Sequence, residues 1–148
     1  MKWNRKFSFA VAITLLLAAI PVFGQIYRYY KPGSIWTVTT VRIAPGMDAA
    51  YMQYLDGAFK KDADAAVKNK FMKSYKILRS IDDDASWNML LLREYDSLSS
   101  IEANEEKADV LSRQVTGEDD GKAMASYEIR NKARQILGTK TMRELVIK

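Results

Sequence analysis

The chain has 148 residues, contains neither cysteine nor histidine, and carries a formal net charge of +5. Without these two residue types it cannot form a disulfide, a Ser-His-Asp or Cys-His catalytic arrangement, or a histidine-ligated haem site, and it lacks the usual zinc and copper ligands. Any chemistry must therefore rely on carboxylates, lysine, arginine, hydroxyl and amide side chains, or tryptophan.

The first segment has the three parts of a secretory signal peptide. A basic start is followed by an almost unbroken apolar run over residues 7–20, and Pro21 ends the run ahead of small or modest side chains. We expect cleavage after Gly24 and export to the periplasm or the medium. The alternative is an uncleaved membrane anchor, although the run is shorter than the about 20 apolar residues that span a bilayer.

Cleavage changes the charge and the length of the working chain. It removes Lys2, Arg5 and Lys6 but no acidic residue, so the net charge falls from +5 to +2. This small charge, together with export, argues against nucleic acid as a partner. The remaining 124 residues are one domain's worth. We expect residues 25–33 to form a tether that ends in a Pro-Gly turn, and residues 34–148 to form a single domain.

Hydrophobic periodicity predicts the elements of this domain in chain order. Residues 34–43 alternate with period two and are rich in β-branched types, which predicts a strand, and the Ala-Pro-Gly that follows ends it. Apolar residues then recur at helical spacing over residues 47–69. The later predicted elements are a hairpin of strands 75–81 and 87–95, helices 97–115 and 122–137, the second ended by Gly138, and a strand over 139–147.

The order β-α-β-β-α-(α)-β predicts a ferredoxin-like α+β fold with an antiparallel sheet and one extra helix before the last strand. Both faces of the predicted sheet are apolar, because Met89 and Leu91 point one way while Leu90 and Leu92 point the other. The helices of this fold cover one face, and a solvated second face should alternate apolar with polar residues. We expect a homodimer through the second face, a ligand cavity, or both; alternatively the tether or the extra helix covers it.

Two segments carry a resemblance to a known family. The strand-turn-helix SIWTVTTVRIAPGMDAAYMQYL (residues 34–55) resembles the opening of the dimeric α/β-barrel superfamily, and TKTMRELVI (residues 139–147) is similar to its last strand. The resemblance covers residues 34–147 and rests on topology and turn chemistry. The superfamily includes cofactor-free quinone-forming monooxygenases, lactone isomerases, haem enzymes and many proteins of unknown role. Its haem branch uses a histidine, which this chain lacks.

Ligand-binding residues are expected on the strands, for a small anionic or aromatic ligand. Arg42 shares a face with Trp36, and Arg93 shares a face with Tyr95. An arginine beside aromatic residues can hold a carboxylate or phenolate by a planar, charge-assisted pair of hydrogen bonds. The alternative is ion pairing at an interface or a strand end. The resemblance adds Asn88, because monooxygenase-like members place Asn, Trp and Tyr in the cavity. The candidate ligand-binding residues are therefore Trp36, Arg42, Asn88, Arg93 and Tyr95, with no metal and no cofactor expected.

Two functions fit these expectations. The leading hypothesis is an exported, dimeric binding or structural module without catalytic machinery. The alternative is a cofactor-independent monooxygenase or isomerase that acts on a small aromatic or lactone compound. This alternative predicts an enclosed cavity on the sheet, lined by Trp36, Asn88 and Arg93 or by residues on the same face. Whether the protein is an enzyme stays open.

Overall fold

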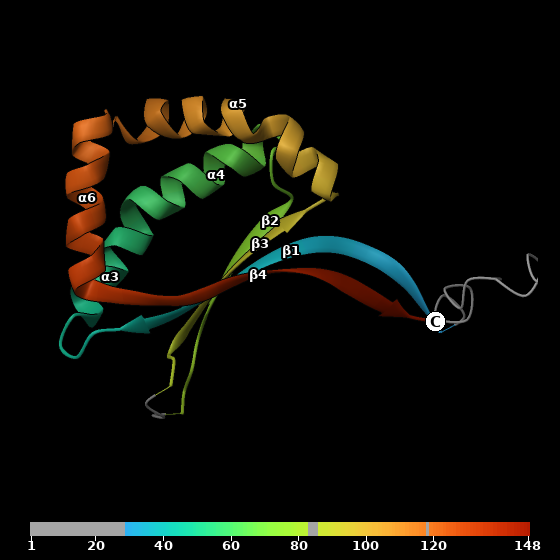
Figure 1. Cartoon of the computed structure of the whole chain (residues 1–148), viewed down its shortest axis with the longest axis horizontal. Coiled ribbons are helices and arrows are strands. Elements are labelled where there is room, and N and C mark those ends of the chain that lie inside the picture. Colours follow the sequence, from blue (N-terminus) through green and yellow to red (C-terminus); the bar gives the residue numbers. More distant parts are fainter. Residues whose placement is uncertain (1–28, 83–85, 118) are drawn as a thin grey trace, which may run out of the picture. The chain divides into compact units, whose positions relative to one another are not determined.

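A computed structural model describes residues 29–82, 86–117 and 119–148. The signal segment predicted for residues 1–24, and most of the tether, lie outside these residues. Figure 1 shows the described elements. In chain order they are β1 (Tyr30–Ile43), α3 (Asp48–Tyr54), the π-helical segment η1 (Leu55–Phe59), α4 (Lys60–Lys68), β2 (Ser74–Arg79), β3 (Met89–Tyr95), α5 (Leu98–Thr116), α6 (Asp120–Ala133) and β4 (Arg134–Ile147).

The four strands form one antiparallel sheet in the order β2-β3-β1-β4. Ile35 of β1 lies opposite Tyr95 of β3, and Val41 lies opposite Met89. On the other side of β1, the hydroxyls of Thr39 and Thr139 lie 2.9 Å apart and tie β1 to β4. The predicted ferredoxin-like α+β fold is confirmed by this topology.

The turn from β1 into the first helix follows from its sequence. Gly46 has a φ of +76°, a left-handed conformation that glycine adopts without steric cost. Asp48 then begins the helix, where its negative charge favours the helix dipole. Helix α3, η1 and α4 follow one another without a break from Asp48 to Lys68, close to the helix predicted over 47–69.

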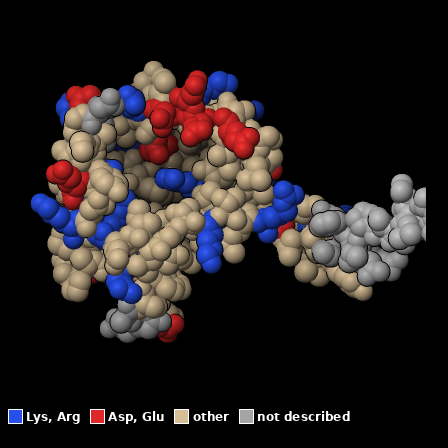
Figure 2. Space-filling model, viewed as in Figure 1, with Lys and Arg blue, Asp and Glu red and all other residues tan. Residues whose placement is uncertain are grey.

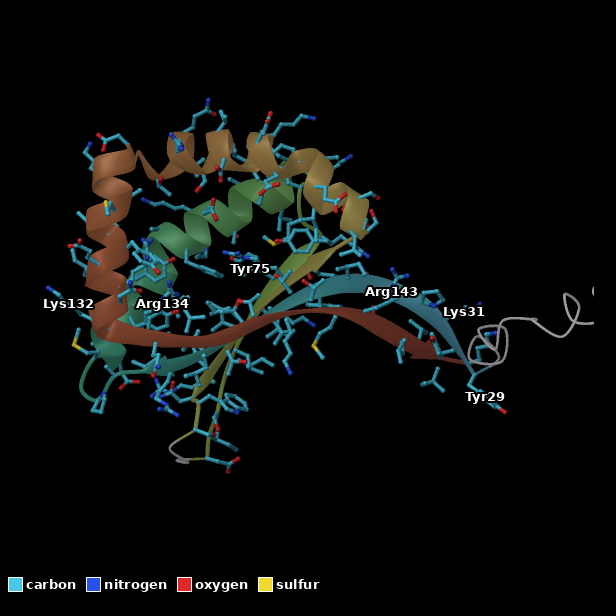
Figure 3. The ribbon with its side chains drawn as sticks, viewed as in Figure 1. Tyr29, Lys31, Tyr75, Lys132, Arg134 and Arg143 are labelled. Atoms are coloured by element: carbon cyan, nitrogen blue, oxygen red, sulfur yellow. The ribbon has the colours of Figure 1, made fainter. Side chains whose placement is uncertain are left out.

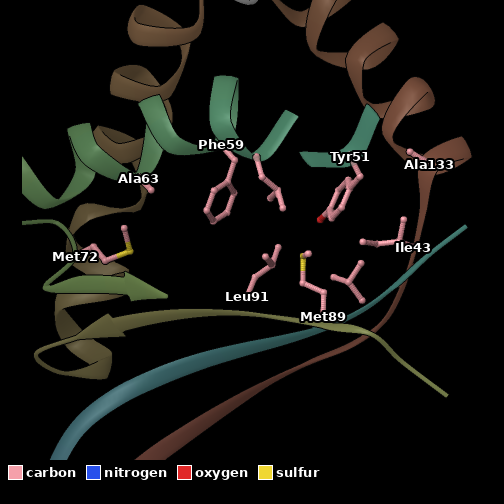
Figure 4. Close-up of a cluster of buried hydrophobic side chains, with 10 residues drawn as sticks. Ile43, Tyr51, Phe59, Ala63, Met72, Met89, Leu91 and Ala133 are labelled. Carbon is pink, nitrogen blue, oxygen red and sulfur yellow. The ribbon is translucent and has the colours of Figure 1, made fainter. Parts of the chain in front are cut away.

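The core lies between one face of the sheet and the helices (Figure 4). Val41 and Met89 from the sheet and Tyr51 from α3 are almost completely buried there. Leu55 and Phe59 of η1 join the same cluster. The apolar side chains of the long helix therefore stay on the sheet side through η1.

Two boundaries differ from the prediction at the ends of the sheet. Strand β1 begins at Tyr30, before the expected start at Ser34, so Pro32 lies in a strand and not in a turn. The pairing of β1 with β3 begins only at Ile35. Proline is tolerated at position 32 because no β3 carbonyl needs a hydrogen bond from its missing N–H.

The second difference concerns α6 and β4. The helix predicted to run to Leu137 ends at Ala133, and Arg134 is already extended, with φ −151° and ψ 158°. Strand β4 therefore runs through Gly138, which was predicted to end the helix. The backbone N–H of Ala44 donates to the carbonyl of Ala133 at 2.9 Å. Pairing with β1 thus overrides the helical preference of the local sequence.

The chain divides into two compact units. The larger, Gly33–Glu144, holds the core and all the helices named above. The other includes Leu145–Lys148 and the described residues 29–32, and within it the N–H of Lys148 donates to the carbonyl of Tyr29 at 3.1 Å. Within the described ranges, no helix has the length and apolar character needed to cross a membrane.

Candidate functional site

Beyond the core, a hollow opens between the helix-facing side of β3 and the helices α4 and α5. Its volume is about 410 Å³, within the roughly 300–1,000 Å³ typical of small-molecule sites. Ala66 of α4 and Ala108 of α5 line it, and their short side chains leave the space between the two helices open. Arg93 and Tyr95 of β3 also line it, because they continue the face that carries Met89 and Leu91. Figure 2 shows a depression in the surface below α5, with charged side chains around it.

Arg93 is the most informative residue of this hollow. It is half-buried, and its guanidinium carbon lies 5.3 Å from the ring centroid of Phe59. Among the described residues, its guanidinium makes no hydrogen bond or ion pair. The neighbouring acids Glu94 and Asp96 are held instead by Lys73, at 3.3 and 3.8 Å. The N–H donors of Arg93 are therefore available for a ligand, and a planar pair of donors suits a carboxylate.

A second arginine faces Arg93 from α6. Both line a smaller hollow of about 130 Å³, which shares Asp62 and Ser112 with the larger one. The guanidinium carbon of Arg130 lies 5.1 Å from the ring centroid of Tyr54. Its Nε is buried and has no hydrogen-bond partner within the described part of the chain. Two cations from different elements thus converge here, each stabilised by an aromatic ring and neither paired with a carboxylate.

Arg134 and Tyr51 both lie beside the ring of Tyr54, which Arg130 also contacts. Arg134 Nη1 donates to the hydroxyl of Tyr51 at 2.8 Å, and the ring of Tyr51 stacks on that of Tyr54 at 5.7 Å. Burial raises the pKa of the Tyr51 hydroxyl above its ordinary 10.0, against the opposing effect of Arg134. Tyr51 therefore stays neutral at physiological pH and acts as a hydrogen-bond acceptor. Figure 3 shows Arg134 and Tyr75 in the space between the helices and the sheet.

The structure separates the five predicted ligand-binding residues onto two faces. Arg93 and Tyr95 line the larger hollow. Trp36, Arg42 and Asn88 occupy the alternate positions of their strands and so belong to the opposite, outer face of the sheet. The cavity that the enzyme hypothesis places beside Trp36, Asn88 and Arg93 together is therefore not formed by these three residues.

The three outer-face residues make structural contacts. Asn88 Oδ1 accepts a hydrogen bond from the N–H of Ile43 at 2.9 Å, which closes the end of the β1–β3 pairing. Arg42 Nε donates to the carbonyl of Ser86 at 2.8 Å. The ammonium of Lys76 lies 5.6 Å from the ring centroid of Trp36.

Sequence reasoning missed Arg130, Asp62 and Tyr54. Arg130 lies within a predicted helix, and only its spacing of three residues from Tyr127 hinted at a cation beside an aromatic ring. Arg130 and Arg93 converge because of the way α6 packs against α3. Local sequence patterns do not predict this packing.

The outer face of the sheet is a second candidate functional surface. Val38, Leu90 and Leu92 are half-buried there although none of the described helices covers them, and Leu78 of the edge strand β2 is 49% exposed. Helix α6 lies with the other helices on the core side, where Arg130 and Arg134 meet Tyr54. Figure 1 shows the labelled helices α3 to α6 on one side of the sheet. The extra helix therefore does not cover the outer face, and that alternative was wrong.

Strand β4 adds a long exposed edge. Every residue from Gln135 to Ile147 is exposed, including apolar Ile136, Leu137 and Met142. An edge strand of this length presents a row of unpaired backbone groups to another chain.

No cluster of metal-ligating side chains accompanies the hollow among the described residues. Across residues 29–82, 86–117 and 119–148, no three acidic side chains gather closely enough to hold a metal ion.

The fold and the hollow define a single-sheet, ferredoxin-like α+β protein with helices on one face of the sheet. A dimeric ferredoxin-like protein from an uncultured marine organism is similar, with a TM-score of 0.50, 14% identity, and coverage of 80% of this chain and 98% of that chain. A second such protein from an uncultured marine organism has a TM-score of 0.49 at 10% identity, covering 80% of this chain and 90% of the other. A NIPSNAP-family protein of unknown function from Agrobacterium tumefaciens has a TM-score of 0.47 at 8% identity, with coverage of 78% of this chain and 90% of that chain.

At this level of identity the first of these likenesses supports the fold alone. No family model matches the chain, and no curated protein matches it.

Proposed function

We propose that this protein is an exported, homodimeric binding module whose protomers each hold a small carboxylate ligand in the hollow above β3. The observation that carries the proposal is Arg93, a half-buried guanidinium that lines the hollow and has no acidic partner among the described residues. A partly desolvated cation that forms no direct ion pair is stabilised when the carboxylate of a ligand contacts it.

The dimer part rests on the outer face. The strands carry apolar side chains on the outer face as well as on the core face. Burial of the outer face against a second copy of the chain would stabilise it. Leu78, Leu90 and Leu92 give this face its apolar centre. The similar marine protein with a TM-score of 0.50 is described as dimeric, which agrees with this proposal. Symmetric pairs are also the commonest oligomers of soluble proteins.

The export part rests on the sequence of residues 1–24. A basic start, an apolar run and a break before Gly24 are typical of a signal peptide. Cleavage there would place the mature protein in the periplasm or outside the cell. Mass spectrometry of the protein recovered from the periplasmic fraction and the medium should give a mature N-terminus at Gln25; a chain that retains Met1 would contradict cleavage.

The ligand part is tested with benzoate and its uncharged analogue benzamide, using the melting temperature of the full mature chain. Benzoate should raise the melting temperature and benzamide should not, because only benzoate carries a charge for Arg93. Arg93→Gln should weaken benzoate binding at least tenfold, since a hydrogen bond to a charged group contributes about 1.5–3 kcal/mol.

Arg42→Gln is the matched control for this experiment. Arg42 is also a strand arginine, but it lies on the outer face and donates to the Ser86 carbonyl. The control should bind benzoate as the native chain does. Equal binding of benzoate and benzamide, or loss of binding in Arg42→Gln, would contradict a carboxylate site at Arg93.

A further inference from the structure

The two hollows beside β3 have three polar side chains in common. Asp62 of α4, Arg93 of β3 and Ser112 of α5 line both the larger and the smaller hollow. We call these three residues the polar junction. An acid, a base and a hydroxyl from three different elements thus lie close together where the hollows meet. Such a junction suits a ligand whose own opposite charges are adjacent.

The acid of the polar junction lies between two small residues of its helix. Ala58, Asp62 and Ala66 follow one another at intervals of four residues, which places them on one face of the helix. Ala58 lines the smaller hollow and Ala66 lines the larger one. The short alanine side chains leave room beside Asp62 on both sides, so a ligand in either hollow can reach it.

Asp62 differs from the other acid of its helix in having no partner. It is half-buried, and it forms neither a hydrogen bond nor an ion pair with the residues that the structure describes. Asp64, by contrast, accepts hydrogen bonds from Lys60 Nζ at 2.8 Å and from the hydroxyl of Tyr75 at 2.7 Å. The carboxylate of Asp62 is therefore available as an acceptor for a donor group of a ligand.

The smaller hollow suits a carboxylate. Arg93 and Arg130 both line it, and the buried Nε of Arg130 has no hydrogen-bond partner among the described residues. Its volume of about 130 Å³ is that of roughly four water molecules. A carboxylate and the carbon atom that carries it fit this space, and the rest of the ligand must extend past the polar junction.

The larger hollow suits an apolar group. Its lining includes the apolar side chains of Phe71, Met72, Tyr95, Ile101 and Leu111. The acidic residues that α5 contributes are exposed, and in Figure 2 acidic side chains gather over α5 on the rim of the depression. Their charges are screened by solvent, so they contribute little to the choice of ligand.

Building on the proposed carboxylate site, we infer that the ligand is an α-amino acid with a large apolar side chain. Its carboxylate binds Arg93 and Arg130 in the smaller hollow, and its ammonium group donates to Asp62 and Ser112 at the polar junction. Its side chain lies in the larger hollow. A ligand with a carboxylate alone leaves Asp62 facing a like charge, and an amine alone leaves both arginines without a counter-charge.

The test compares phenylalanine with two analogues that each lack one charged group. These are 3-phenylpropanoate, which has no ammonium group, and phenethylamine, which has no carboxylate. Calorimetry on the mature chain should give phenylalanine an affinity at least about tenfold higher than that of either analogue, because each analogue loses charge-assisted hydrogen bonds.

Asp62→Asn tests the residue that distinguishes an amino acid from a simple carboxylate. Phenylalanine should bind this variant about tenfold more weakly, whereas 3-phenylpropanoate should bind it at least as tightly as the native chain, because a like charge has been removed. Asp64→Asn is the matched control from the same helix, and it should retain the native preference for phenylalanine. Circular dichroism of both variants checks that the fold is kept.

The outcomes separate this inference from the proposed carboxylate site. If 3-phenylpropanoate binds as tightly as phenylalanine, or if Asp62→Asn keeps the native preference, the amino acid is overturned and the carboxylate site is retained. If phenylalanine, 3-phenylpropanoate and benzoate all fail to bind, both are overturned. Phenethylamine binding as tightly as phenylalanine would show that the arginines contribute nothing, and it would overturn both as well.

Discussion

The two faces of the sheet are built from the same strands and differ in what lies against them. On the core face, Val41 and Met89 are almost fully buried under Tyr51 and the helix that carries it. On the outer face, Leu90 and Leu92 are equally apolar but only half-buried, and Leu78 is exposed. An apolar sheet face therefore does not by itself indicate that the face is buried within one chain. The core face is stabilised within one chain, whereas the outer face still has area to bury.

The largest effect is expected on the core face. Met89→Ala removes a buried side chain from the centre of the cluster and leaves a cavity. It should lower the free energy of unfolding by about 2–5 kcal/mol, measured by urea denaturation. This loss in the free energy of unfolding should be the same at all protein concentrations, after the contribution of dimer formation has been subtracted. A loss below about 1 kcal/mol would mean that this face is not the principal core.

The next effect tests the outer face. Leu90→Asp places a charge between Thr40 and Leu78 at the centre of the proposed dimer surface. Light scattering or sedimentation should give the mass of one chain instead of two, because a buried unpaired charge costs more than the interface gains.

Two variants accompany this measurement. Leu78→Asp, on the exposed edge strand, should have the same effect with less risk to the fold, which circular dichroism can check. Val110→Asp is the control, because Val110 is an exposed apolar residue on α5, on the opposite layer. A native chain that is already monomeric, or dimers that survive both sheet substitutions, would contradict the proposed interface.

The smallest effect concerns the polar end of the outer face. Ser74 Oγ donates to Glu94 Oε2 at 2.6 Å, and Lys73 lies 3.3 Å from the other carboxylate oxygen. The hydrogen bond from Ser74, supported by Ser34 and Lys73, holds the pKa of Glu94 below its ordinary 4.5. Because the folded-state pKa is lowered, this contribution is fully present above about pH 5 and is lost as the pH falls through the folded-state pKa.

Glu94→Gln should therefore lower the free energy of unfolding by about 1 kcal/mol at pH 7 and by much less at pH 3. Parallel urea titrations at the two pH values measure this difference. A difference between the native chain and the variant that stays constant, or grows toward acid pH, would contradict the proposed stabilisation of the carboxylate.

The alternation of side chains made much of the fold predictable from sequence. It placed Met89, Leu91, Arg93 and Tyr95 on one face of the third strand, and the structure confirms that assignment. It also indicated that both faces of the sheet are apolar. These statements depend on the local geometry of a strand, in which successive side chains point to opposite sides.

The errors occur where distant contacts decide the structure. Residues 134–137 fit a helical pattern, but the pairing of β4 with β1 in the sheet makes them a strand. The hollow could not be predicted from local patterns, because Ala66 of α4, Ala108 of α5 and Arg93 of β3 line it together. The structure places the candidate arginines Arg42 and Arg93 on different faces of the sheet, and only the face of Arg93 lies under the described helices.

The position of β1 in the sheet has a consequence for the folding kinetics. This central strand is the first strand of the domain in the sequence, and its partner β4 is the last, with the paired Thr39 and Thr139 separated by 100 residues. Such distant pairing is slow, because a long loop must close before any contact in it is gained. A hairpin of β2 and β3 packed under α4 can form early, but β1 keeps one open edge until the final residues join. A chain shortened by its last strand would hold its core residues but leave β1 as an unpaired edge of the sheet.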